Sequence, residues 1–192
     1  RKSLILFSVL SFVSGSALIY VAFGGEVTDS IIFLVLGLGA IAAAIKYTVG
    51  KSPYGYAGLG DVFVLLFFGL AGVGGSYYLY ANEIRVEVFL PALGCGFFAV
   101  GVLNVNNIRD IASDQKAGKK SIPVRLGKSN AIKYHVLLIV VGWFTALLFS
   151  FRFFDSWLNF IYLITLPVFL LHLRRLISAA DSKSIDPLLK QL

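Results

Sequence analysis

Six apolar segments, each near the length of a bilayer's hydrocarbon core, most constrain what this chain of 192 residues can fold into. A helix needs about 20 apolar residues to cross that core. The segments are residues 4–23, 30–49, 62–81, 88–108, 132–151 and 157–173. Because lipid offers no hydrogen-bond partners to the backbone, we expect each segment to be a helix and the fold to be an all-α, polytopic membrane bundle.

The composition agrees with a membrane protein. Hydrophobic residues make up 58% of the chain and charged residues only 14%, against about 25% charged residues in soluble domains. The net charge of +7 comes from cations that lie between apolar segments rather than on one polar domain. No nucleic acid partner is therefore expected, and the lipid bilayer is the expected surrounding.

Counting lysine and arginine predicts the orientation of the segments. The count assigns both termini, the second connection (residues 47–61) and the fourth connection (residues 109–131) to the cytoplasmic side. We therefore expect a multi-pass membrane protein. Its two long polar connections would open on the same, cytoplasmic face.

Five residues inside or near the apolar segments are expected to have structural roles. Cys95 is the single cysteine, so no intrachain disulfide is possible, and it is expected to pack as a small hydrophobe. His135 and His172 have no neighbour at metal-ligand spacing and are expected to be helix-end residues. Pro91 and Pro167 could kink their helices.

Residues 104–120, where the fourth apolar segment leaves the hydrocarbon, contain the strongest candidate site. On a continuous helix, Asn107, Asp110 and Asp114 lie three and four residues apart and share one face. Two carboxylates on one face repel each other unless a cation lies between them. Mg²⁺ suits such a place, because it prefers one or two carboxylates together with substrate phosphates.

The cations beside these carboxylates extend the same interpretation. Arg109, Lys119 and Lys120 would face the remaining phosphate charge, arginine as a fork and lysine as a point charge. The alternative is a solvated polar cap at the end of a membrane helix. The excess of asparagine in residues 104–107 argues against an ordinary cap.

The second connection contains a second candidate group. Tyr47 and Lys51 are four residues apart, so one helical turn could aim a ring and an ammonium group at the same place. Glycines and a proline then break the helix, and Asp61 begins the next one, where a carboxylate suits the N-terminus. The tyrosines could instead be interfacial belt residues and Asp61 an N-cap. The concentration of Tyr47, Tyr54, Tyr56, Lys51 and Asp61 favours a site.

Taken together, the two connections resemble the UbiA superfamily of intramembrane prenyltransferases. Within it they are most similar to the menaquinone-pathway branch, which prenylates 1,4-dihydroxy-2-naphthoate. The segments that carry the resemblance are residues 47–56, 58–61, 106–119 and 124–127. The resemblance implies a helical bundle of about nine spans around a cavity that opens to lipid, of which this chain would supply six.

The resemblance also implies a role for each candidate residue. Asp110 and Asp114 would be catalytic and hold Mg²⁺ on the diphosphate of an allylic polyprenyl donor. Lys51 is implied as a further catalytic residue. The residues implied in binding the substrates or neutralising the leaving diphosphate are Tyr54, Asp61, Asn107, Arg109 and Lys119. Tyr47 or Tyr54 could stabilise the allylic cation through the ring quadrupole. The aromatic acceptor then attacks, and its carboxylate leaves as CO₂ to give demethylmenaquinol.

The chain departs from the family pattern at its start. The family has a first aspartate-rich motif of the Asn-x-x-x-Asp-x-x-x-Asp kind, and nothing before Tyr47 fits it. We therefore expect residues 1–192 to be a single transmembrane prenyltransferase domain that lacks the N-terminal helices with that motif and the last helix.

Other functions are compatible with parts of the sequence. The acceptor could be another aromatic such as 4-hydroxybenzoate. A transporter or channel fragment would also use glycine-rich helices and intramembrane polar residues. Transporters, however, place charges near the bilayer midplane, whereas every acid here lies outside the apolar segments or at their ends. A purely structural membrane subunit explains neither polar connection.

Overall fold

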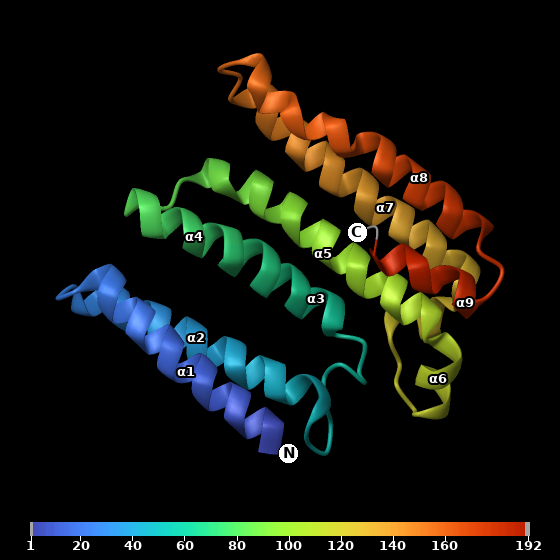
Figure 1. Ribbon diagram of the computed structural model, residues 1–192, viewed down its shortest axis with the longest axis horizontal. Coiled ribbons are helices and arrows are strands. Elements are labelled where there is room, and N and C mark those ends of the chain that lie inside the picture. Colours follow the sequence, from blue (N-terminus) through green and yellow to red (C-terminus); the bar gives the residue numbers. More distant parts are fainter. Residues whose placement is uncertain (1, 191–192) are drawn as a thin grey trace. The chain divides into compact units, whose positions relative to one another are not determined.

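The computed structural model describes residues 2–190, and these residues form helices and no strands (Figure 1). The elements in chain order are α1 (Lys2–Phe23), α2 (Val27–Thr48), α3 (Gly60–Val64), the π-helical η1 (Leu65–Ala71), α4 (Gly72–Ala81), the 3₁₀ segment η2 (Val86–Val88), α5 (Phe89–Arg109), α6 (Ile111–Lys116), α7 (Ile122–Arg152), the 3₁₀ segment η3 (Trp157–Thr165), α8 (Leu166–Ser178), α9 (Ser182–Ile185) and the 3₁₀ segment η4 (Asp186–Lys190). Arg1, one of the basic residues by which the N-terminus was assigned to the cytoplasmic side, lies outside the described residues.

Six helical stretches of residues 2–190 are long and apolar enough to cross a membrane. They are Lys2–Phe23, Val27–Thr48, Gly60–Ala81, Val86–Arg109, Ile122–Arg152 and Trp157–Ser178. They coincide with the six predicted segments and confirm the all-α membrane fold class. The protein is therefore a multi-pass membrane protein.

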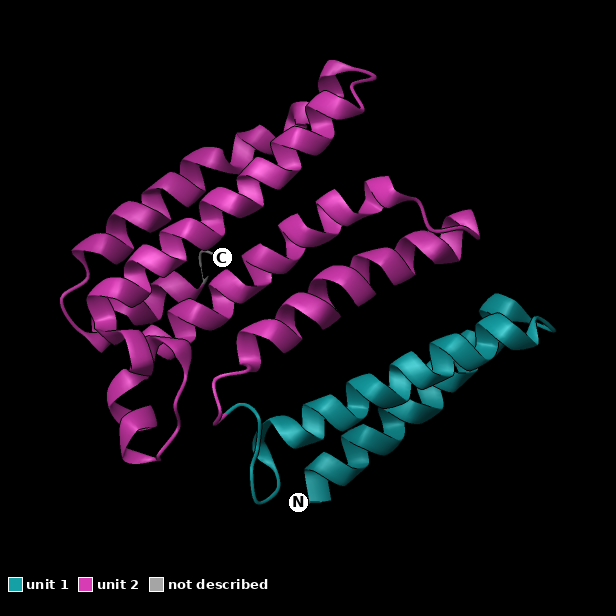
Figure 2. Ribbon diagram, turned by 180° about the vertical axis from the view of Figure 1, so that it is seen from behind, with its two compact units in different colours: residues 1–55 teal, residues 56–192 magenta. Residues whose placement is uncertain are grey.

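The chain forms two compact units, residues 1–55 and residues 56–192 (Figure 2). In the first unit, α1 and α2 form an antiparallel helical hairpin. Phe23 and Phe33 contact each other near its turn, with ring centroids 4.9 Å apart. The apolar side chains of both helices are largely exposed, as suits helices that face lipid.

In the second unit, α5 lies between the η1–α4 stretch and α7 (Figure 1). Glycines allow the close approach on both sides. An added Cβ at Gly69 of η1 would lie 2.9 Å from the Gly96 Cα of α5. An added Cβ at Gly94 would lie 3.0 Å from the Thr145 hydroxyl of α7. The helices thus contact each other through small residues at these positions.

The two prolines begin helices instead of kinking them. Pro91 lies in the first turn of α5 and Pro167 in the first turn of α8, where a missing N–H group breaks no intrahelical bond. Cys95 lies on an exposed face of α5, so the expectation that it packs inside as a small hydrophobe is wrong.

The expectation for the two histidines is also wrong. His135 of α7 and His172 of α8 are fully buried, and their Nε2 atoms are 3.1 Å apart. The antiparallel pairing of α7 and α8 brings together two residues that are far apart in the sequence. Two imidazoles at this distance share one N–H···N hydrogen bond, so the pair links the two helices.

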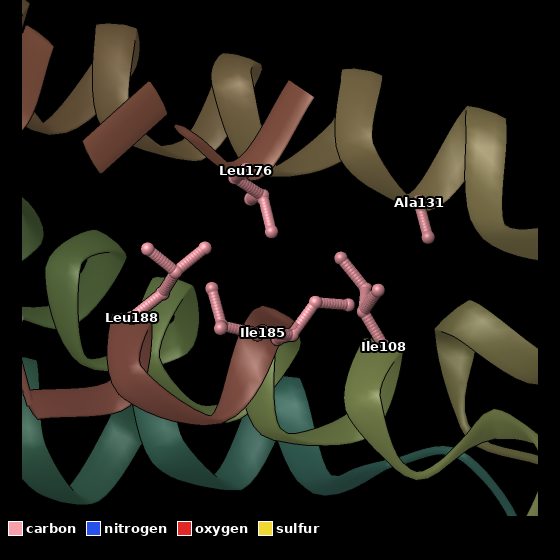
Figure 3. Close-up of a cluster of buried hydrophobic side chains, with 6 residues drawn as sticks. Ile108, Ala131, Leu176, Ile185 and Leu188 are labelled. Atoms are coloured by element: carbon pink, nitrogen blue, oxygen red, sulfur yellow. The ribbon is translucent and has the colours of Figure 1, made fainter. Parts of the chain in front are cut away.

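Buried apolar side chains fix the end of the described chain beneath the end of α5 (Figure 3). The cluster consists of Val105, Ile108, Ala131, Leu176, Ile185 and Leu188. Its members come from α5, α7, α8, α9 and η4. The segment after α8 is therefore packed against the part of α5 that precedes Asp110.

Candidate active site

The helix that leads into the site is interrupted at one residue. α5 ends at Arg109, and Asp110 has non-helical dihedral angles of φ −95° and ψ 7° before α6 begins at Ile111. The Asp114 N–H still donates to the Asp110 carbonyl oxygen at 2.8 Å. The helical path therefore resumes after Asp110, and the continuous helix considered from the sequence is corrected to two helices with a break.

Asp110 is held by its neighbour in sequence. Arg109 Nε donates to Asp110 Oδ1 at 2.8 Å, and Arg109 Nη2 donates to Asp110 Oδ2 at 2.9 Å. The same Nη2 donates to Asn106 Oδ1 at 2.8 Å. These hydrogen bonds and the positive charge lower the pKa of the Asp110 carboxyl below its usual value, because they favour the carboxylate.

Asp114 belongs to a separate group. Lys119 Nζ lies 2.9 Å from Asp114 Oδ2 and donates to Asn107 Oδ1 at 3.1 Å, while the Ser121 hydroxyl donates to Asp114 Oδ2 at 3.3 Å. Gly118, with φ +71°, allows the turn that brings Lys119 back to α6. The Lys119 and Asp114 side chains are only 16% and 13% exposed, so the pair is shielded from solvent.

The structure therefore divides the predicted carboxylate cluster. Asp110 is neutralised by Arg109, and Asp114 is neutralised by Lys119. The expected mutual repulsion of the carboxylates is relieved by a resident cation on each. Lys119 joins Asn107 to Asp114, although the sequence analysis expected Lys119 to face phosphate.

The start of the second unit joins the second connection to the fourth. The Lys120 N–H donates to the Tyr56 carbonyl oxygen at 2.8 Å, and Arg125 Nη2 donates to the Ala57 carbonyl oxygen at 2.6 Å. Gly58 has φ +78°, and an added Cβ would lie 2.5 Å from the Lys120 carbonyl oxygen, so only glycine fits there. Residues 56–58, the part of the second connection that belongs to the second unit, therefore lie beside the fourth connection.

Asp61 lies in the first turn of α3, as predicted, and has a partner on another helix. The Tyr134 hydroxyl of α7 donates to Asp61 Oδ2 at 2.9 Å. The carboxylate is thus more than a local cap, because it links α3 to α7. Tyr134 was not predicted, since a single tyrosine inside an apolar helix gives no signal of its partner.

The remaining predicted residues lie in the first unit. Tyr47 and Tyr54 contact each other edge to face, with ring centroids 5.5 Å apart and planes at 71°. The Tyr54 N–H donates to the Lys46 carbonyl oxygen at 3.2 Å, which folds the loop back onto the end of α2. Lys51 is exposed. A single site that contains Tyr47, Tyr54, Lys51 and the two aspartates stays a prediction.

The segment after α8 contributes two residues that were not predicted. Arg109 Nη1 donates to Asp186 Oδ1 at 2.9 Å, and the Ser182 hydroxyl donates to the Arg109 carbonyl oxygen at 2.8 Å. A cavity of about 480 Å³ lies between this segment and the end of α5. Its lining includes Arg109, Asp110, Ser113, Lys116, Lys183 and Asp186.

Comparison with known proteins identifies the family. The model of the UbiA prenyltransferase family matches residues 1–191. The chain belongs to this family. The resemblance inferred from the two polar connections is thereby confirmed over nearly the whole sequence.

Relatives of this UbiA-family chain include two proteins named 1,4-dihydroxy-2-naphthoate octaprenyltransferase. The one from Haemophilus influenzae is 44% identical over 192 residues, and the one from Escherichia coli is 41% identical over 191 residues. Each match covers 100% of this chain and 62% of the relative's length. A 2-carboxy-1,4-naphthoquinone phytyltransferase from Synechocystis is 32% identical over 95 residues, which are 48% of this chain and 31% of that protein. No solved structure gave a significant match.

The end of α5 in this UbiA-family chain carries side-chain oxygen atoms of the kind that Mg²⁺ takes as ligands. Asp110 and Asp114 present carboxylate oxygens, and Asn106 and Asn107 present amide oxygens nearby. No group of three or more His, Cys, Asp or Glu residues that could hold a metal ion occurs within residues 2–190. Mg²⁺ does not require such a cage, because it keeps waters and uses substrate phosphates as further ligands.

Three residues that hydrogen-bond with Arg109 were not predicted, and the sequence contains a signal for only one of them. Asn106 lies four residues before Asp110, as Asp110 lies four before Asp114, so the helical spacing could have included it. Asp186 and Ser182 are far from Arg109 in the sequence, and no local pattern connects them. Only the packing of α9 and η4 against α5 brings Asp186 and Ser182 to the site.

Proposed function

We propose that the protein containing this chain transfers a polyprenyl group from an allylic polyprenyl diphosphate to 1,4-dihydroxy-2-naphthoate, with loss of CO₂ and diphosphate, to give demethylmenaquinol. The observation that carries the proposal is the pair of carboxylate–cation groups at the end of α5 in a UbiA-family chain. The names of the two relatives that match the whole chain support the choice of acceptor and of donor class.

In this proposal, the two carboxylates and the two cations of the site change partners when the donor binds. Asp110 and Asp114 would hold Mg²⁺, which supplies positive charge to the departing diphosphate. Arg109 and Lys119 would then leave the carboxylates and donate to phosphate oxygens. Charged donors already placed at the site stabilise a developing negative charge without reorganising water.

The organic step needs a shielded cation and an aromatic acceptor. Cleavage of the allylic C–O bond gives diphosphate and an allylic cation. The Tyr47 and Tyr54 rings, which already contact each other, offer faces that attract a cation without forming a bond. The acceptor ring supplies the electron pair of the new C–C bond, and loss of CO₂ returns an electron pair to the ring. Lys51 and Asp61 are proposed to bind the substrates' polar groups.

The membrane setting suits both substrates. Residues 1–192 are proposed to be one transmembrane domain of the bacterial inner membrane, with the site at the cytoplasmic face. A polyprenyl chain gains about 0.8 kcal/mol for each methylene kept out of water. The diphosphate can then reach the polar helix end while the chain stays in lipid.

The test uses membranes that contain the full-length protein, a polyprenyl diphosphate and Mg²⁺. We expect prenylated naphthoquinol with 1,4-dihydroxy-2-naphthoate and little product with 4-hydroxybenzoate as the only acceptor. Preference for 4-hydroxybenzoate would reassign the acceptor. Absence of product with either acceptor, in membranes where the protein is abundant, would overturn the proposal.

A further inference from the structure

Arg109 is shared between two carboxylates from distant parts of the chain. Its Nε and Nη2 donate to Asp110, and its Nη1 donates to Asp186 Oδ1 at 2.9 Å. With the additional bond from Nη2 to Asn106, all three guanidinium nitrogens are engaged. Asp186 therefore holds the edge of the guanidinium that Asp110 does not use.

The segment that carries Asp186 is anchored by other contacts. Ile185 and Leu188, on either side of Asp186, are buried in the apolar cluster (Figure 3). Lys128 Nζ donates to the Ala179 and Ala180 carbonyl oxygens at 2.8 Å each. The position of the segment thus does not depend on the Asp186 carboxylate.

A capping interaction adds to this anchoring. Asp181 begins α9 with a capping box, in which its side chain accepts from the Ser184 N–H at 2.9 Å. Asp186 itself is 67% exposed, and exposed ion pairs contribute little to folding. Its bond to Arg109 is therefore better explained by an effect on Arg109 than by an effect on the fold.

We propose that Asp186 is a positioning residue that keeps the Arg109 guanidinium at the site when Asp110 exchanges it for the metal ion of a bound diphosphate. This inference rests on the proposed function. When Asp110 releases Arg109, two of the guanidinium's hydrogen bonds are lost. The bond from Nη1 to Asp186 would still hold the guanidinium beside the cavity that both residues line.

The alternative is that Asp186 only fastens the last segment. The two roles differ in what they change. A fastening residue would alter the stability of the unliganded protein. A positioning residue would alter diphosphate binding, because an unrestrained Arg109 is free to remain on Asp110 and oppose the metal ion there.

The experiment compares Asp186→Asn, which keeps the shape and removes the charge, with Asp186→Glu, which keeps the charge. Both are made in the full-length protein. Glu83→Gln is the matched control, since Glu83 is also an exposed carboxylate paired with an arginine, Arg85, outside the site. One readout is the KM for prenyl diphosphate, and the other is the rise in melting temperature caused by inorganic diphosphate with Mg²⁺.

We expect Asp186→Asn to raise the KM by about three- to tenfold with kcat within about twofold, since it removes a charge-assisted contact that is partly screened by solvent. The diphosphate-dependent rise in melting temperature should shrink in parallel. Asp186→Glu should have a KM and a diphosphate-dependent rise in melting temperature close to those of the wild type, and Glu83→Gln should match the wild type in both. In an Arg109→Gln background, Asp186→Asn should have no further effect, because its partner is already absent.

Two results, besides wild-type behaviour of Asp186→Asn, would overturn the inference. The first is a lower melting temperature of the unliganded Asp186→Asn protein with an unchanged KM, which would make Asp186 a fastening residue. The second is an equal rise in KM on Asp186→Asn in the wild-type and Arg109→Gln backgrounds. If wild type is active, Asp110→Asn is inactive and Asp186→Asn behaves as wild type, only this inference fails. If Asp110→Asn is as active as wild type, the proposed function fails first.

Discussion

At the scale of single residues, the site is defined by which cation holds which carboxylate. Arg109 forms a two-pronged contact with Asp110, and Lys119 forms a shielded contact with Asp114. A carboxylate with a resident cation is stable before any substrate arrives. Under the proposed function, it would exchange that cation for a metal ion, and the cation would then bind phosphate. The same contacts therefore explain both the folded state and the proposed binding of the donor.

Neutralising either aspartate should stop turnover without unfolding the protein. We expect Asp110→Asn and Asp114→Asn each to lower prenyl transfer by at least about 100-fold, because each removes a carboxylate proposed to hold the Mg²⁺ whose positive charge the departing diphosphate requires. Product formation is measured over a range of Mg²⁺ concentrations, with protein abundance measured in the same membranes. Ordinary turnover at ordinary Mg²⁺ in both variants would exclude the metal-binding role.

The lowered pKa of Asp110 predicts an acid-sensitive contribution to stability. A carboxyl whose pKa is lower in the folded state stabilises that state fully above its unfolded pKa of about 3.9, and the contribution is lost as the pH falls through the folded value. Asp110→Asn should thus lose less stability on acidification than the wild type. Melting temperatures in detergent, measured from about pH 6 to pH 3, test this. Identical slopes in the two proteins would contradict it.

At the scale of elements, the connections between helices do most to build the candidate site. The break at Asp110, the turn at Gly118 and the close contact at Gly58 place polar groups that a straight helix would spread apart. The α7–α8 pair is joined by His135 and His172 inside the bundle. The sequence predicts part of the first group of features, because the glycines of the second connection indicate a break in the helix there. It does not predict the histidine pair, because spacing along one helix does not determine which residue a second helix presents.

The loop after α2 offers a direct comparison between a site and a lipid interface. If Lys51 binds diphosphate or the acceptor carboxylate, Lys51→Ala should raise one KM by about tenfold or more, since a charged hydrogen bond contributes about 1.5–3 kcal/mol. Tyr47→Phe should keep activity and Tyr47→Leu should lose it if the ring face matters. Steady-state kinetics with both substrates give the answer. Unchanged kinetics in Lys51→Ala and Tyr47→Leu would make these residues interface anchors.

The histidine pair predicts a non-additive effect on stability. His135→Leu or His172→Leu alone leaves the other imidazole buried without its partner, at a cost of about 1–3 kcal/mol. The double leucine variant removes both polar groups and should be more stable than the sum of the single effects implies. Thermal unfolding in detergent measures all three variants. A double variant destabilised by the full sum would show that the two rings do not act as a pair.

At the scale of the whole molecule, the fold could be predicted further than the site. Six apolar segments set the number and limits of the spans, since backbone hydrogen bonding in lipid leaves few alternatives. The spacing of Asn107, Asp110 and Asp114 located the polar helix end. It did not predict that Asp110 and Asp114 have different cations, nor that Asp186 reaches Arg109. Those features depend on turns and on packing between distant segments, which single-sequence periodicity does not encode.

The central claim is tested most directly by measuring the two products of the proposed reaction, CO₂ and prenylated naphthoquinol, in the same sample. Membranes with the full-length protein receive a polyprenyl diphosphate, Mg²⁺ and 1,4-dihydroxy-2-naphthoate labelled in its carboxylate, and labelled CO₂ is measured beside the prenylated naphthoquinol. The account predicts that the two appear in equal amounts and that both disappear in Asp110→Asn. Release of CO₂ without prenylated product would contradict it. So would an Asp110→Asn variant that forms both products in the same amounts as the wild type.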